Sequence, residues 1–247
     1  MNAVIDIVKA EYQKTKRSMR RNLIWAFPAI TLALAFILTL GMTNSYAESV
    51  WNWWYTLLLP GMLAIVCHLT VAQEKKTHYY HLTTLPISKK KLMTGKIIWL
   101  GCAILLANSI VFAGASLGGL LLTTRVPLRG AAIAVLLLTV TQLWEIPVFL
   151  FFSERFGMIA ELLLSLFVTV GGTIIAPSKI WYLFVSAIPM RILCPYLHIL
   201  PNGLPAEAGE PLLNQSVVVP GICLSVLWFA LTNVLFLKWF EKREVQV

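Results

Sequence analysis

The chain is poor in charge and in cysteine, and it contains a single aspartate. Charged residues make up 13% of its 247 residues, whereas a soluble globular domain carries about 25%. The one aspartate, Asp6, stands in the N-terminal segment, so no Ser-His-Asp triad can assemble in the apolar part of the chain. The four cysteines include no C-x-x-C pair. We therefore expect neither a disulfide nor a zinc site.

Two further motifs are missing. The H-E-x-x-H pattern of metalloproteases is absent, and the four histidines are scattered along the chain. Gly95 and Lys96 lack the upstream glycine of G-x-x-x-x-G-K, and no other segment could cradle a nucleotide phosphate. We therefore expect no metal and no cofactor in this chain.

Long apolar runs dominate what is present, because apolar residues make up 58% of the chain. A run of about 20 apolar residues crosses a hydrocarbon core of about 30 Å as a helix, whereas barrel strands would alternate polar and apolar residues. The sequence predicts an all-α integral membrane protein without a cleavable signal peptide. Six transmembrane helices are expected, in residues 22–41, 53–72, 92–121, 131–152, 158–176 and 217–237.

Basic residues predict the orientation. Sixteen Lys and Arg residues fall in the N-terminal segment, the 73–96 and 153–157 connections and the C-terminus, against four in the remaining connections. Both termini are therefore expected in the cytoplasm. The net charge of +9 is explained by the basic residues that direct membrane insertion and by contact with anionic membrane lipid. It requires no nucleic-acid partner.

A single domain is expected over residues 1–247. It consists of an interfacial helix at 1–21, the six-span bundle at 22–237 and a cytoplasmic tail at 238–247. Val4, Val8, Tyr12, Thr15 and Met19 recur at helical spacing among basic residues, which is typical of a helix lying flat at a membrane surface. The alternative is a plain basic tail.

Residues 180–200 are also about as long as a span. Two prolines, Arg191 and His198 argue against a crossing, because a charge near a helix centre costs at least ~2.5 kcal/mol. We expect re-entrant or interfacial helices on the outer face, followed by a turn-rich lid. Arg191, Asn202, Glu207 and Glu210 are the candidate polar residues of this region, and the two glutamates could attract a cationic peptide or be ordinary surface.

The polar stretch between the second and third spans is predicted to form a helical projection. Glu74 to Thr77 extend the second span, Pro86 ends the projection, and Ser88 caps the helix that begins at Lys89. Its candidate contact residues for a cytosolic partner are Glu74, Thr77, Tyr79, Tyr80, Leu82, Leu85 and Pro86. The alternative is a solvated loop whose lysines only determine the orientation of the chain in the membrane.

Polar residues within the spans are candidates for the bundle interior or a transport pathway. Glu145 could hydrogen-bond to a neighbour such as His68, or face a cationic substrate. Asn108 and Gln142 are expected to hydrogen-bond between helices. Gly114 and Gly118 form a G-x-x-x-G face, either for packing within the chain or for a seam with a second permease.

The pattern E-K-K-T-(4)-L-(3)-P-I-S-K-(5)-G-K, from Glu74 to Lys96, resembles the first cytoplasmic loop of ABC-2 type transporter permeases, where it carries the coupling helix. The resemblance implies a separate ATP-binding cassette subunit, in two copies, that binds ATP and Mg²⁺ and docks on this loop. It also implies a second permease, as a heterodimer or homodimer, in a bacterial plasma membrane. The chain itself would not be an enzyme.

The segment WYLFVSAIPMRILCPYLHILPNG, which ends at Pro201, Asn202 and Gly203, resembles lantibiotic-immunity permeases. This resemblance implies an exporter that expels a cationic antimicrobial peptide from the membrane. Three alternatives stay open: export of another drug or an ion, a polytopic membrane enzyme that uses Glu145 as a buried acid, and a passive channel or sensor subunit.

Overall fold

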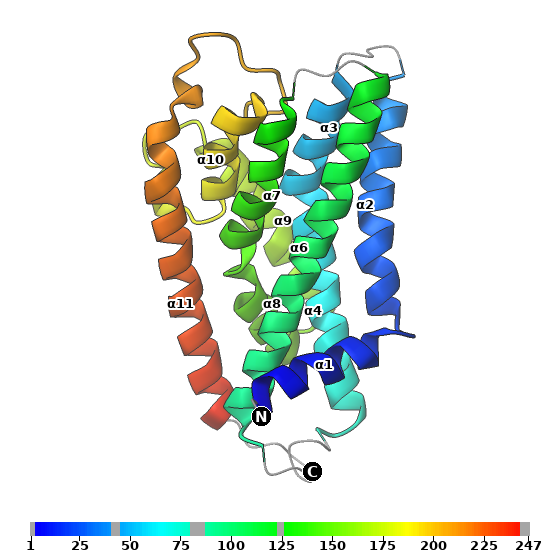
Figure 1. Cartoon of the computed structure of the whole chain (residues 1–247). Coiled ribbons are helices and arrows are strands. Elements are labelled where there is room, and N and C mark those ends of the chain that lie inside the picture. The colour runs from blue at the N-terminus through cyan, green and yellow to red at the C-terminus, as the bar shows by residue number, and fades with distance from the viewer. Residues whose placement is uncertain (1–2, 41–44, 80–86, 123–125, 243–247) are drawn as a thin grey trace.

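The fold is an all-α integral membrane bundle (Figure 1). The computed structural model describes residues 3–40, 45–79, 87–122 and 126–242. Within these residues the only β-type pairing is an isolated bridge between Ile199 and Pro205. The principal helices are α1 (Ala3–Thr15), α2 (Met19–Leu38), α3 (Tyr46–Trp53), α4 (Leu59–Lys76), α6 (Lys89–Leu121), α7 (Leu128–Gln142), α8 (Glu145–Arg155), α9 (Met158–Ile175), α10 (Ala187–Leu197) and α11 (Val218–Lys242). Short helical turns are η2 (Trp54–Leu58), η3 (Trp181–Leu183), η4 (Pro211–Leu213) and η5 (Gln215–Val217).

Five of the six predicted spans are confirmed by length and composition, and the sixth, expected as one helix over residues 131–152, is a bent pair of helices. Five helical segments are long and apolar enough to cross a membrane, and the second of them joins α3 and α4 through the π-turn η2. The sixth is the pair α7 and α8, bent by 43°. Pro147 explains the break, because its ring would clash with the carbonyl group of residue 143 in a continuous helix.

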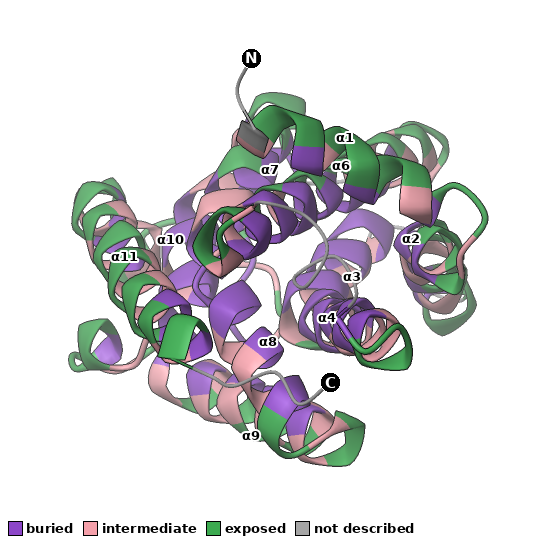
Figure 2. Ribbon diagram, turned by 90° about the horizontal axis from the view of Figure 1, so that it is seen from below, coloured by how far each residue is buried: buried purple, intermediate pink, exposed green. Residues whose placement is uncertain are grey.

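Helix α1 crosses the side of α6 near one end of the bundle, and we call this end the α1 end (Figures 1 and 2). Ile7, Glu11 and Thr15 are its buried face, whereas Tyr12 of the predicted apolar face is 55% exposed. The helix packs on α6 at Gly95, where an added Cβ would lie 2.5 Å from Ile7 Cγ2. It ends at Thr15, so residues 19–21 of the segment expected to lie flat belong to α2.

Residues 180–200 do not form a seventh span. Helix α10 has 11 residues, about 16 Å at 1.5 Å per residue, which is too short to cross. It lies buried against α7 and α9 near the end opposite α1 (Figure 1). His198, at φ 57°, ends α10 in the left-handed conformation.

Two glycines allow α10 to pack this closely. A Cβ at Gly130 would lie 2.0 Å from the carbonyl oxygen of Tyr196, and one at Gly172 would lie 2.7 Å from that of Ser186. Both obstacles are backbone atoms, which cannot rotate away as a side chain can. The contact between α10 and its neighbours therefore requires glycine at both positions.

We expect Gly130→Val to lower the melting temperature of the detergent-solubilised protein by several degrees. Overpacking a well-packed core costs about 1 to 3 kcal/mol, and the Cβ of the new side chain would meet backbone at 2.0 Å. Gly61→Ala is the matched control, because nothing lies within 4 Å of a Cβ at that helical glycine. Equal melting temperatures for the two variants would contradict the packing.

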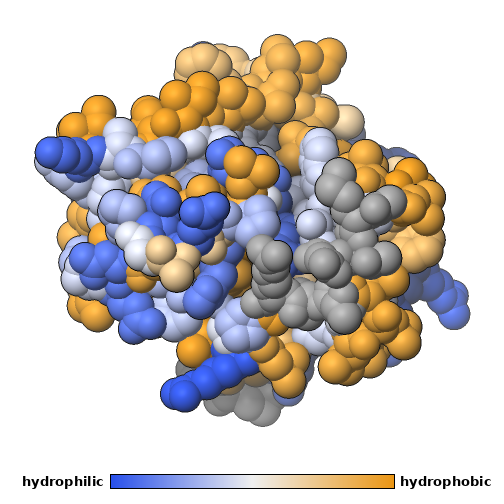
Figure 3. Space-filling view, turned by 90° about the horizontal axis from the view of Figure 1, so that it is seen from above, coloured by the Kyte–Doolittle hydropathy of each residue, from blue (hydrophilic) through white to orange (hydrophobic). Residues whose placement is uncertain are grey.

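The outer surface of the bundle is apolar. Figure 2 shows exposed residues on the outward faces of α2, α9 and α11 and buried residues toward the centre, and the exposed faces carry large apolar side chains such as Phe36, Phe167 and Leu227. Seen from the end opposite α1, hydrophilic side chains gather over the centre and apolar ones over much of the rim (Figure 3). This distribution fits a bundle surrounded by lipid.

The G-x-x-x-G face of α6 packs within the chain. A Cβ at Gly114 would lie 2.3 Å from Leu32 Cδ1 of α2, and one at Gly118 would lie 2.2 Å from Tyr46 Cε1 of α3. The structure therefore agrees with the first of the two predictions for this face, packing within the chain.

Candidate functional site

Helix α4 ends at the α1 end in a Schellman motif. The Tyr79 N–H donates to the Glu74 carbonyl at 2.9 Å, and the His78 N–H donates to the Lys75 carbonyl at 3.0 Å. After the connection, the Ser88 hydroxyl accepts a hydrogen bond from the Lys91 N–H at 3.3 Å, which confirms the predicted cap of α6. The two long helices thus have defined ends on either side of the connection.

The predicted contact residues of the connection separate into two groups. Thr77 is exposed, whereas Glu74 and Tyr79 are 3% and 6% exposed. Tyr79 is therefore not available as a surface contact in this structure, because the Schellman turn directs its ring back onto the bundle. Tyr80, Leu82, Leu85 and Pro86 lie outside the described residues.

Glu74 belongs to a buried group of charges, which we call the charge network and define as Glu11, Lys14, Arg20, Glu74 and Lys96. The Lys96 ammonium lies 2.7 Å from Glu11 Oε1 and 2.7 Å from Glu74 Oε1. Lys14 contacts the same two atoms at 3.0 and 3.1 Å. The two carboxylates therefore hold α1, α4 and α6 together at one point.

Arg20 joins α2 to this point. Its guanidinium lies 3.5 Å from Glu11 Oε2, donates to Thr70 Oγ1 at 3.2 Å, and also donates to Gln73 Oε1. It stands over the ring of Trp99 at 5.5 Å. Glu11, Arg20 and Lys96 are each no more than 2% exposed.

Ionisation of Glu11 is maintained by its partners. Burial alone would raise the pKa of its carboxyl, but Lys96 and Lys14 outweigh burial and lower that pKa to about 2. Burial would lower the pKa of Lys14, but Glu11 and Glu74 outweigh it and raise that pKa. Because the folded pKa of Glu11 is depressed, its contribution to stability is complete above pH 4.5 and is lost as the pH falls toward 2.

A second set of contacts ties the end of α4 to α8. The Tyr79 hydroxyl donates to Glu154 Oε1, and the Lys75 ammonium lies 3.5 Å from Glu154 Oε2 and donates to the Glu154 carbonyl at 3.0 Å. The Tyr79 ring also lies 6.3 Å from that of Phe240 in α11. We call Lys75, Tyr79 and Glu154 the α8 clamp. The end of α4 is thus held on two sides, by the charge network and by the α8 clamp.

Polar side chains also meet inside the bundle between α4, α8 and α9. His68 Nδ1 lies 2.9 Å from Ser153 Oγ and 3.9 Å from Glu161 Oε2. In a hydrolytic triad the serine and the acid contact opposite ring nitrogens, whereas here both approach Nδ1. This geometry argues against a Ser-His-Glu hydrolase.

Glu145 is 2% exposed and lies at the α7–α8 break. The structure gives His68 the partner Ser153 in place of the expected Glu145. Among the described residues Glu145 Oε2 has no hydrogen-bond partner, and no group of three His, Cys, Asp or Glu residues could hold a metal ion. This arrangement supplies no second catalytic group beside Glu145.

Asn108 links three elements of the bundle. Its Oδ1 accepts from Trp54 Nε1 at 2.8 Å, and its Nδ2 donates to Thr139 Oγ1 at 2.9 Å, which connects η2, α6 and α7. Gln142 is buried, and within the described residues its Oε1 has no partner. The expected bonding between helices is therefore seen at Asn108 but not at Gln142 Oε1.

The candidate residues of the opposite end are dispersed. Arg191 lies on α10, half-buried, and Asn202 accepts from the Leu204 N–H at 3.1 Å in a turn. Glu207 is exposed and Glu210 half-buried in the following loop. Asn202 also lines an open groove of about 320 Å³ between the end of α3, η2, α9 and the 201–202 turn, whose other polar lining residues are Asn52, Thr56, Thr169 and Thr173.

Sequence reasoning missed the buried pair of Glu11 with Lys96 and the contacts of Glu154 with Tyr79 and Lys75. Two of these residues carried a usable signal. Lys96 follows Leu92 and Met93 on an apolar helix, and Glu11 is the only acid among six basic residues between positions 9 and 21. A lone charge on an apolar face indicates a buried partner of opposite sign.

The chain was compared with models of protein families. A family model described as an ABC-2 family transporter protein matches residues 7–170, which is 164 of 247 residues. The matched part includes the charge network, the α8 clamp and the connection between α4 and α6. No curated protein matches the chain.

Proposed function

The chain belongs to the ABC-2 family of transporter proteins, and we propose that it is a permease subunit that expels a lantibiotic or similar cationic antimicrobial peptide from the membrane. Membership in this family makes it a transmembrane component of a transporter with an ATP-binding cassette partner. We assign ATP and Mg²⁺ to that partner. Gly95 and Lys96 are buried inside a helix and could not form a phosphate loop.

The observation that carries the proposal is the two-sided attachment of the end of α4. Glu74 contacts cations from α1 and α6, and Tyr79 and Lys75 contact Glu154 of α8. A displacement of the connection by the ATP-binding subunit would therefore move α1, α4, α6 and α8 together. This arrangement suits a subunit that receives mechanical work from a partner.

We propose that the α1 end faces the cytoplasm. Helix α1, the end of α4, the start of α6 and the end of α11 share this end (Figure 1), and sixteen of the twenty Lys and Arg residues fall in the N-terminal segment, the 73–96 and 153–157 connections and the C-terminus. The ATP-binding subunits would dock there, in two copies. A second permease, the same chain or a sister chain, would complete the transport pathway.

Two features of the opposite end support a peptide cargo. The groove beside α9 combines threonine and asparagine side chains with a wall open toward the exposed apolar face of α9. An amphipathic peptide could place its polar face on the former while its apolar face stays in lipid. Glu207 and Glu210 lie on the same end and would attract cationic residues.

The proposal is tested in a sensitive bacterium that produces the chain with its ATP-binding subunit and second permease. We expect the inhibitory concentration of a lantibiotic to rise severalfold, with no change for an uncharged antibiotic. A partner whose ATP-hydrolysing glutamate is replaced is the control and should give no protection. Correctly assembled complex without protection would reject the peptide cargo, whereas failure of the subunits to co-purify would reject the assembly.

A further inference from the structure

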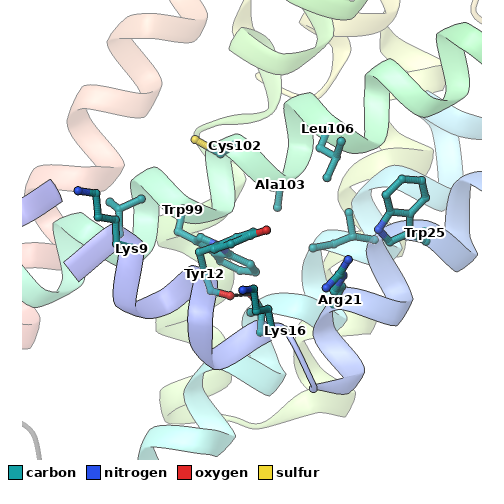
Figure 4. A pocket seen from close by; sticks show the side chains of 12 residues that line it. Lys9, Tyr12, Lys16, Arg21, Trp25, Trp99, Cys102, Ala103 and Leu106 are labelled. Atoms are coloured by element: carbon teal, nitrogen blue, oxygen red, sulfur yellow. Dashed lines mark hydrogen bonds between the residues drawn. The ribbon is translucent and has the colours of Figure 1, made fainter. Parts of the chain in front are cut away.

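A pocket of about 480 Å³ lies at the α1 end, in the angle between α1, α2 and α6. Its long wall is apolar, and Figure 4 shows Cys102, Ala103 and Leu106 of α6 along it, with Trp99 and Tyr12 near the opening. Trp25 closes the side formed by α2. The pocket is separate from the charge network, because none of the five network residues lines it.

Three basic side chains, from α1, from the turn that follows it and from α2, also line this pocket. Lys9 and Lys16 of the N-terminal segment and Arg21 of α2 are all exposed, and Lys16 stands 5.8 Å from the centre of the Tyr12 ring. The pocket thus combines a cationic opening with an apolar wall that continues along a membrane-spanning helix. A ligand that fits must carry an anionic group at one end and a hydrocarbon chain at the other.

We propose that this pocket binds one anionic glycerophospholipid. The phosphate would lie between Lys16 and Arg21, which are neighbours in Figure 4, with Lys9 adding positive charge on the other side of Tyr12. An acyl chain would follow the wall from Trp99 to Leu106. Helix α1 crosses α6 near the α1 end of the bundle (Figure 1), and an amphipathic helix with a basic face binds where lipid headgroups meet the hydrocarbon core. Each basic residue near an anionic lipid surface adds to binding, so three of them favour an anionic headgroup over a zwitterionic one.

A second copy of the chain is a poorer occupant. A two-fold contact through this pocket would place the same patch on both subunits, and would bring the three cations of one copy against the three cations of the other. A bound lipid would instead neutralise them. It would also fill the space beside α1 and hold this helix, and with it Glu11, against α6.

Cysteine reactivity tests the proposal in the full chain. Cys102 lines the pocket, Cys223 is exposed on α11, and Cys67 and Cys194 are buried. We expect phosphatidylglycerol, added to the detergent-solubilised protein, to slow alkylation of Cys102 while Cys223 reacts as before. Phosphatidylcholine and glycerol phosphate, which lack the charge or the chains, should leave both rates unchanged.

Charge variants identify the headgroup contact. The triple variant Lys9→Gln, Lys16→Gln and Arg21→Gln should raise the phosphatidylglycerol concentration for half-protection of Cys102 roughly a hundredfold. The matched control is Arg17→Gln with Lys90→Gln and Lys91→Gln, which removes equal charge from exposed residues outside the pocket. In this control, phosphatidylglycerol should protect Cys102 as it does in the native chain. Equal protection by phosphatidylcholine, protection by glycerol phosphate alone, or full protection in the triple variant would overturn the proposal.

Discussion

Replacement of Glu11 by Gln is expected to lower the stability of the protein by about 3 to 5 kcal/mol, which is the cost of breaking a buried ion pair from one side. Glu11 is the only residue of the network that contacts all three cations, Lys14, Arg20 and Lys96. Without it, Glu74 alone would balance three buried or half-buried positive charges. For a chain of this size the melting temperature should fall by about 10 °C.

Loss of the carboxylate should act first on α1. Hydrogen exchange of the amides in Ala3–Thr15 should become fast in Glu11→Gln, while the amides in the centre of α6 stay protected. Asp6→Asn is the matched control, because Asp6 is an exposed acid on the same helix. Adding Lys96→Met to Glu11→Gln restores the original net charge of the network and should recover part of the loss. Indistinguishable Glu11→Gln and Asp6→Asn proteins would contradict the stabilising role of the network.

The second large effect concerns capture of the ATP-binding subunit. Lys76 and Thr77 are exposed beside the connection, and we expect Lys76→Glu with Thr77→Glu to weaken co-purification of that subunit at least about tenfold, or ~1.4 kcal/mol. Two carboxylates buried in a contact without cationic partners are costly whatever surface the subunit presents. The fold should change little, since a carboxylate at an exposed helix C-terminus costs about 0.3 to 1 kcal/mol.

Two further variants separate docking from other causes. Lys238→Glu with Lys242→Glu also introduces two carboxylates, on the exposed end of α11 at the same end of the bundle, and its larger change in net charge should still leave capture intact. Tyr79→Phe removes only the hydroxyl that reaches Glu154; it should retain capture but reduce ATP-dependent transport. If the α4 and α11 variants lose capture to the same extent, the docking site is not at the end of α4.

The long elements could be predicted because their signals are local. Six apolar runs correspond to the spans, and Ser88 before three lysines marks the start of α6. The short length of α10 agrees with the expectation from Pro189, Pro195 and Arg191. Each of these features depends on a single stretch of sequence, in which the cost of a polar or helix-breaking residue can be judged directly.

The site could be predicted only in part, because its contacts join residues far apart in the sequence. Lys96 meets Glu11, which precedes it by 85 positions, and Tyr79 meets Glu154, which follows it by 75. Spacing cannot indicate which acid a basic residue will contact. The burial of the Tyr79 ring has a more local cause. The turn at His78, with φ 48°, reverses the direction in which the following side chain points.

Because the residues of the charge network are far apart in the sequence, they are synthesised at different times. Arg20 leaves the ribosome 76 positions before Lys96, roughly 4 to 15 seconds at ordinary rates of translation. During that interval Lys14 and Arg20 remain hydrated charges that can fix the orientation of the first span. They become buried only after α4 and α6 have been inserted. In the proposed orientation, the same two side chains would serve first as an insertion signal and then as permanent ties of the folded protein.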